Sequence, residues 1–130
     1  MKKVIALLLV ILAVGICITS CSKYTSSYSS TILITTDRSD KGSMEFASFK
    51  GTKVFKLKNN GNGILKYEGE LKSGTMDVFY DSDGTKKKLF TINGGDESIS
   101  DTLEFEGDYI YVICECDETC DDGKLAFKTK

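Results

Sequence analysis

The chain has 130 residues, with 17 basic and 19 acidic side chains, a net charge of −2 and no histidine. A mildly acidic chain lacks the excess of Lys and Arg that neutralises phosphates, so we expect no nucleic-acid partner. Without histidine, Ser–His and Cys–His nucleophilic catalysis is impossible, and the commonest zinc ligand is missing. We therefore predict a protein that is not an enzyme.

The N-terminus has three regions of different character. Lys2 and Lys3 are followed by an apolar run, Val4–Ile16, and then by small polar residues. This order is typical of a secretory signal peptide, and the run is too short to cross a bilayer comfortably. The sequence predicts that the protein is exported and that residues 1–20 are its signal peptide.

The segment Ile18-Thr19-Ser20-Cys21 directly follows the apolar region. It resembles the lipobox of bacterial lipoproteins. The resemblance implies cleavage before Cys21 and attachment of a diacylglycerol to its thiol. Two acyl chains hold a protein stably at a bilayer without a spanning helix. We therefore expect a lipid-anchored protein on the extracytoplasmic side of the bacterial cell membrane.

Residues 21–31 are rich in Ser and Thr, which predicts a flexible tether before a domain at 32–130. From Ile32 onward, apolar and polar residues alternate with a period of two, which indicates half-buried strands. The expected strands are Ile32–Thr35, Met44–Phe49, Val54–Lys58, Leu65–Lys72, Met76–Tyr80, Leu89–Ile92, Ile99–Phe105, Tyr109–Cys114 and Leu125–Phe127.

Glycine, asparagine and aspartate separate these strands. Gly51 is expected to end the second strand, and the Asn- and Gly-rich residues 59–63 predict a hairpin turn. Asp81–Gly84 predicts another turn. Since no segment after Cys21 shows a helical period, we predict a single antiparallel β-sandwich, jelly-roll-like, of eight or nine strands.

Residues 74–84, followed later by 107–112, resemble bacterial pre-peptidase C-terminal domains and related GOLD-like sandwiches. The resemblance implies a small non-catalytic module that accompanies other domains or binds partners. The expected function is thus a membrane-anchored interaction module of the cell envelope, with a protein or a glycan as ligand. The first alternative is a cation-dependent binding domain that uses the acidic, Cys-rich hairpin described below. The second is a glycan-acting hydrolase, which requires two carboxylates facing each other across a cleft.

Three cysteines, Cys114, Cys116 and Cys120, lie close together at the expected tip of the last hairpin. In an exported protein such cysteines favour a disulfide over a metal site. Cys116 and Cys120 flank the expected turn and could bridge it, and Cys114 with Cys120 is the alternative pair. Three thiolates could instead bind zinc or copper.

The same segment is acidic. Its five carboxylates could provide the oxygen ligands that calcium prefers, which would make this hairpin a cation-dependent binding site. No other cofactor is expected. The five acids are Glu115, Asp117, Glu118, Asp121 and Asp122.

Overall fold

The structure is a computed structural model that describes residues 24–130, and these residues form eight strands and no helix. Accordingly, no helix within 24–130 is long and apolar enough to cross a membrane. The predicted all-β class is confirmed. The strands are β1 (Ser27–Thr31), β2 (Ile34–Asp37), β3 (Lys41–Lys58), β4 (Ile64–Ser73), β5 (Thr75–Asp81), β6 (Lys87–Asn93), β7 (Ile99–Glu104) and β8 (Tyr109–Thr129).

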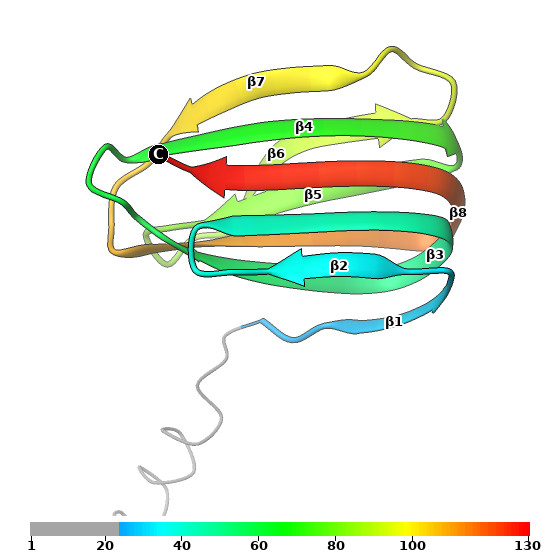
Figure 1. Cartoon of the computed structure of the whole chain (residues 1–130), viewed down its shortest axis with the longest axis horizontal. Coiled ribbons are helices and arrows are strands. Elements are labelled where there is room, and N and C mark those ends of the chain that lie inside the picture. The colour runs from blue at the N-terminus through cyan, green and yellow to red at the C-terminus, as the bar shows by residue number, and fades with distance from the viewer. Residues whose placement is uncertain (1–23) are drawn as a thin grey trace, which may run out of the picture.

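Two long strands, β3 and β8, run through both layers of the sandwich (Figure 1). The first part of β3 pairs with β2, and its second part pairs with β1. The first part of β8 pairs with β5, and its second part pairs with β4. One layer therefore has the order β2-β3-β8-β4-β7 and the other the order β1-β3-β8-β5-β6, all antiparallel. The predicted antiparallel sandwich is confirmed.

Both long strands change direction at the same corner. The register of β3 and β8 shifts between Phe49, which faces Cys120, and Gly51, which faces Cys116. Gly51 has a φ of 117°, which an L side chain rarely adopts. Gly51 thus bends β3 but does not end it, contrary to the prediction, and the cysteine-rich segment is a bulged corner of β8 where a hairpin was expected.

The core lies between the two layers and consists mostly of side chains that alternation placed on the inside. On β4, for example, Leu65, Tyr67 and Leu71 are buried, while the charged residues between them are exposed. Ile113, which shares the parity of Tyr109 and Tyr111, is also buried but is not part of this core cluster. The largest fully buried side chains are Phe49, Phe55, Phe127, Met44, Leu57, Leu65, Met76, Ile92, Ile110, Ile113, Leu125 and Val78.

Part of the expected tether belongs to the sheet. Strand β1 pairs with β3 in antiparallel register, and the backbone N–H of Val54 donates to the Ser26 Oγ at 2.9 Å. The domain therefore begins before residue 32, which corrects the predicted boundary. An edge strand can be held mainly by backbone hydrogen bonds, so β1 needs few apolar side chains. The predicted lipidation site, Cys21, lies outside the described residues.

The connections also differ in part from expectation. Residues 59–63 join β3 to β4, which do not pair with each other, so this loop passes between layers and is not a hairpin turn. The Asn59 Oδ1 accepts hydrogen bonds from the backbone N–H groups of Gly61 and Gly63 and so closes the loop locally. The turn at Asp81–Gly84 does join a hairpin, β5–β6, and the Asp81 Oδ1 accepts from the Gly84 N–H at 2.8 Å.

Candidate functional site

The cysteines lie in the core at the bulged corner of β8. Cys114, Cys116 and Cys120 are all buried. Cys116 and Cys120 lie on either side of the three residues of the bulge, and their Sγ atoms are 2.7 Å apart. The structure thus brings together the pair that we expected to flank a turn, although the turn itself is a bulge.

Burial controls the chemistry of these thiols. It raises the pKa of Cys114 and, together with a hydrogen bond to Cys120, raises the pKa of Cys116 far above the usual value. Burial also raises the pKa of Cys120, whose Sγ donates to the Thr75 carbonyl oxygen at 3.3 Å. Because the thiolate is both the nucleophile and the metal ligand, these groups are poor nucleophiles and poor zinc or copper ligands in this state.

The five acids near the cysteines do not converge on one point. The Glu115 carboxylate pairs with the Lys86 Nζ at 3.0 Å, and the Asp122 carboxylate lies 3.9 Å from the Lys72 Nζ. Asp117, Glu118 and Asp121 are exposed. Across residues 24–130, no three Asp, Glu, Cys or His side chains are grouped as a metal site would require. Calcium binding here stays a prediction that the arrangement of these side chains does not favour.

Tyrosines gather on the outer face of the layer that contains β5 and the first part of β8. Tyr109 and Tyr111 are two positions apart on β8 and therefore project from the same face. The Lys56 Nζ, from the neighbouring β3, lies 4.4 Å from the Tyr109 ring centroid and 5.7 Å from that of Tyr111. Such cation–π contacts hold the lysine stem across both rings.

Tyr24 extends this aromatic group from the chain that precedes β1. Its ring meets the Tyr111 ring edge to face, with 5.4 Å between centroids, and its hydroxyl donates to the Asp81 Oδ2 at 2.6 Å. Burial, and after it the hydrogen bond to Asp81, raises the pKa of Tyr24 to about 12. The hydroxyl therefore stays protonated as a donor at neutral pH, and Tyr24 is fixed to the domain.

A concavity of about 310 Å³ lies beside these rings. We call it the tyrosine cavity. Its lining combines two aromatic rings with an ammonium group, carboxylates and a hydroxyl, a composition suited to a polar ligand that also has apolar faces. The lining residues are Lys56, Asp81, Ser82, Gly84, Asp108, Tyr109 and Tyr111.

The sequence contained part of the signal for this cavity. Alternation along β8 places Tyr109 and Tyr111 on the outer face, and alternation along β3 places Lys56 on a basic face. That β3 and β8 are neighbours, and that Asp81 comes close through β5, follows only from the sheet order. The sequence therefore indicates the side of the strand on which each residue lies, but not that these residues lie close together.

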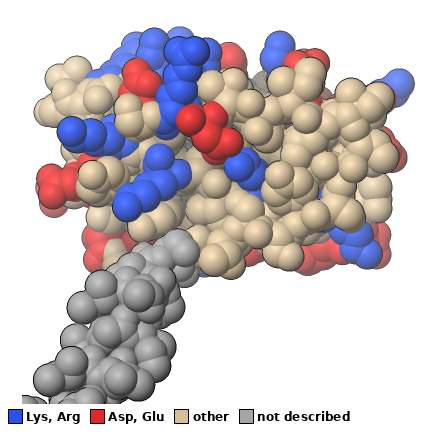
Figure 2. All heavy atoms as spheres, turned by 60° about the horizontal axis from the view of Figure 1, so that its bottom comes forward, with Lys and Arg blue, Asp and Glu red and all other residues tan. Residues whose placement is uncertain are grey.

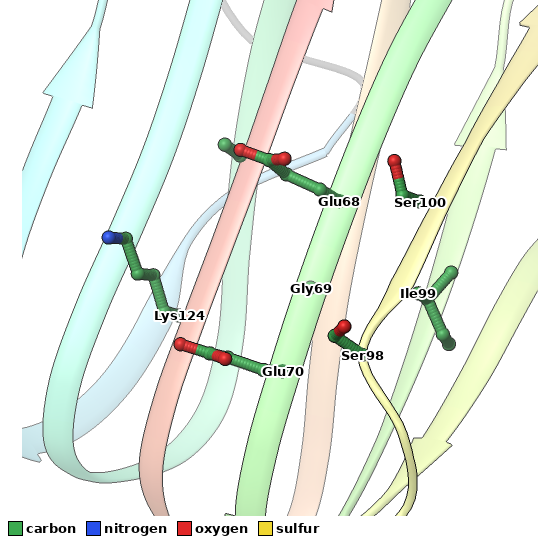
Figure 3. Close-up of a pocket in the computed structure, with 8 residues that line it drawn as sticks. Glu68, Gly69, Glu70, Ser98, Ile99, Ser100 and Lys124 are labelled. Atoms are coloured by element: carbon green, nitrogen blue, oxygen red, sulfur yellow. The ribbon is translucent and has the colours of Figure 1, made fainter.

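A second hollow, of about 260 Å³, lies along β4 and includes two carboxylates (Figure 3). Glu68 and Glu70 flank Gly69, and both side chains extend toward β8, where Lys124 is the register partner of Glu70. Both glutamates are exposed. Because they project side by side from one strand and do not face each other across a cleft, this hollow lacks the arrangement that glycoside hydrolysis requires.

No protein-family model matches the chain, and no curated protein does. A variant of the CBM29-2 carbohydrate-binding module complexed with mannohexaose is similar in structure, with 14% identity, a TM-score of 0.41 and coverage of 83% of this chain and 79% of that one. A structure described as carbohydrate-binding module family 29 has 14% identity, a TM-score of 0.39 and coverage of 83% and 76%. The Clostridium difficile EutQ protein has 14% identity, a TM-score of 0.36 and coverage of 81% and 69%. The resemblance to pre-peptidase C-terminal domains stays a prediction.

Proposed function

We propose that this chain is a lipid-anchored, non-catalytic binding module of the bacterial cell envelope, and that it binds a glycan at the tyrosine cavity. The observation that carries the binding function is the pair of outward-facing rings, Tyr109 and Tyr111, with Lys56 over them at the edge of a concavity.

The lipid anchor is supported by the short stretch of chain that separates the N-terminal apolar run from the folded domain. The apolar run Val4–Ile16 is followed by Cys21, and the side chain of Tyr24 is already packed on the domain. A signal peptide that ends before Cys21 would therefore leave almost the whole mature chain for the domain. The lipid would hold that domain on the extracytoplasmic side of the membrane.

A glycan suits the chemistry of the cavity. Where Lys56 does not cover it, the face of a tyrosine ring offers apolar contact to the C–H groups of a sugar, and the ring edges and hydroxyls stay polar. Sugar hydroxyls both donate and accept hydrogen bonds, which matches an ammonium group at Lys56 and a carboxylate at Asp108. Side chains two apart on a strand project about 7 Å from each other, so the two rings can contact neighbouring parts of one ligand.

The proposal predicts that removing one ring weakens glycan binding. The full chain in detergent is titrated calorimetrically with linear oligosaccharides of glucose, mannose and N-acetylglucosamine. Tyr109→Ala and Tyr111→Ala should each lower the affinity for the sugar that binds by about tenfold or more, because a buried aromatic contact is worth at least about 1.4 kcal/mol. The matched control is Tyr28→Ala, which removes a similarly exposed ring on β1. Equal losses in all three variants, or no binding by the unchanged protein, would refute the glycan site.

We also propose that the exported protein carries a Cys116–Cys120 disulfide. The two Sγ atoms are already in contact, so closing the bond needs only a small movement. Before folding buries them, the two thiols would lose two protons and two electrons to an extracytoplasmic disulfide oxidant, by thiol–disulfide exchange. A bond across so short a loop contributes about 2 kcal/mol in the chain-entropy model. It would fix the corner where both long strands bend.

A further inference from the structure

The side of the sandwich formed by β1 and β2 differs from the rest of the surface in its composition. Residues 24–36 include no charged side chain, although 28% of the chain is charged. Four large hydrophobic side chains are exposed in residues 24–130, and three of them lie here: Tyr28 at 42%, Ile32 at 77% and Ile34 at 63%. Figure 2 shows this side, with an uncharged area in the right half of the view and charged side chains around its margin.

This side is also an open edge of both layers. Within residues 24–130, β1 and β2 pair only with β3, so their other edges have no strand partner. Proteins usually protect such edges with charges. The opposite edges follow that rule, because β6 contains Lys87 and Lys88 and β7 contains Asp101 and Glu104. The β1–β2 edge has no such protection before Asp37, at its far end.

Ile32 stands at the corner between the two strands in an unfavourable conformation. Its φ is 50°, in the left-handed region where a β-branched residue is a rare exception and where glycine or asparagine is usual. The chain therefore keeps a strained isoleucine in solvent where a polar residue would fit the backbone better. A strained and exposed apolar residue is a reason to look for a function.

The anchor determines what lies next to this edge. Only two residues separate Cys21 from Tyr24, and Tyr24 is fixed to the domain. Three residue steps span at most about 11 Å, so a lipid on Cys21 would keep the start of β1 at the bilayer surface. From there β1 runs to Ile32 without a charge.

We propose that the β1–β2 edge lies on the lipid bilayer, with Ile32, Ile34 and Tyr28 in the interfacial region. This inference rests on the lipid anchor of the proposed function. The depth is limited to the interface, where water and head groups can still bond the open strand edges, because an unpaired edge is not tolerated in the hydrocarbon core. In this orientation both layers stand upright on the membrane, and the tyrosine cavity lies on an outer face close to the bilayer, because Tyr24 packs against its lining residues Tyr111 and Asp81.

The test uses the absence of tryptophan from the chain, so that each introduced tryptophan is the only one. The Ile32→Trp protein, produced from the full-length gene product and processed by the cell, is reconstituted into vesicles of phosphatidylcholine and phosphatidylglycerol. The vesicles are made with and without brominated acyl chains, which quench tryptophan fluorescence. Thr102→Trp, exposed on β7 at the opposite edge, is the matched control, and Ile34→Trp is a second reporter on the same side in case the Ile32 variant does not fold.

We expect the brominated lipid to quench the β1–β2 reporters several-fold more strongly than the Thr102→Trp control. Vesicle flotation of the same samples separates the two proposals. Protein that does not float with vesicles lacks the anchor, which refutes the proposed function and this inference together. If the protein floats with the vesicles but both β1–β2 reporters stay unquenched, the anchor is present and this inference is refuted. The edge then faces either water or a second copy of the chain, and cross-linking would detect the second copy.

Discussion

Gly51→Ala is expected to destabilise the domain by about 3 kcal/mol or more and to release β1 from the sheet. Two costs add at this position. Gly51 has a φ of 117°, and holding a non-glycine residue in such a region costs about 1–3 kcal/mol. A Cβ atom there would also lie 2.3 Å from the Ser27 carbonyl oxygen and 2.7 Å from the Tyr28 Cα, both backbone atoms of β1.

Gly61→Ala separates these two costs. Gly61 has a similar φ of 102°, but a Cβ atom there meets nothing within 4 Å. The two variants are compared by urea unfolding and by limited proteolysis of residues 27–33. We expect Gly51→Ala to be the less stable variant and the only one with faster cleavage in β1. Equal stability and equal cleavage would mean that β1 does not pack against Gly51.

Phe49→Ala is expected to lower the free energy of unfolding by about 3–5 kcal/mol, the usual cost of removing a buried phenylalanine. Phe49 is 0% exposed and faces Cys120 at the corner of the two long strands. Its ring contacts those of Phe46 and Tyr28, at centroid distances of 5.4 and 5.3 Å. The cavity would open where both layers meet, so little can collapse to fill it.

Urea unfolding measures this effect, and Tyr28→Ala is the control. Tyr28 contacts the same ring from the outside and is 42% exposed, so its removal should cost much less, about 1 kcal/mol. If Phe49→Ala is no less stable than Tyr28→Ala, the corner is not a packed part of the core.

Alternation of apolar residues was sufficient to predict the class and most of the strands. The prediction from alternation failed where the residues that face the core change from even to odd positions in the sequence. In β3, Met44 and Phe46 face the core and then Phe49 and Phe55 do, so the inward positions shift from even to odd. In a sequence this shift resembles the end of one strand and the start of another. β3 was predicted as two short strands because Gly51 was expected to end the first of them, and β8 because its acidic residues were expected to form a turn.

The same break explains the error at the cysteines. Residues 117–119 are acidic and polar and interrupt the alternation, which is typical of a turn. In the structure they are the bulge opposite Lys50, and β8 continues beyond them. The proximity of Cys116 and Cys120 could be predicted because both a hairpin and a bulge place them across a short loop. Their burial could not, since it depends on the packing of two layers at the corner.

The tyrosine cavity depends on strand order, which local sequence patterns do not contain. Lys56, Asp81 and Tyr111 come from three strands that are neighbours only because β8 pairs with both β3 and β5. Strand β1 was missed for a different reason. Its side chains are mostly exposed and polar, so its backbone pairing left no apolar pattern to recognise.

The most direct test of the account is the intact mass of the protein extracted from bacterial membranes, recorded with and without reduction before thiol alkylation. We expect a chain that begins at Cys21 and carries a diacylglycerol, with two thiols that become alkylatable only after reduction. A chain that retains residues 1–20, or that begins elsewhere without lipid, would contradict the lipid anchor. If Cys114, Cys116 and Cys120 are all alkylated without reduction in the unfolded protein, the disulfide is wrong.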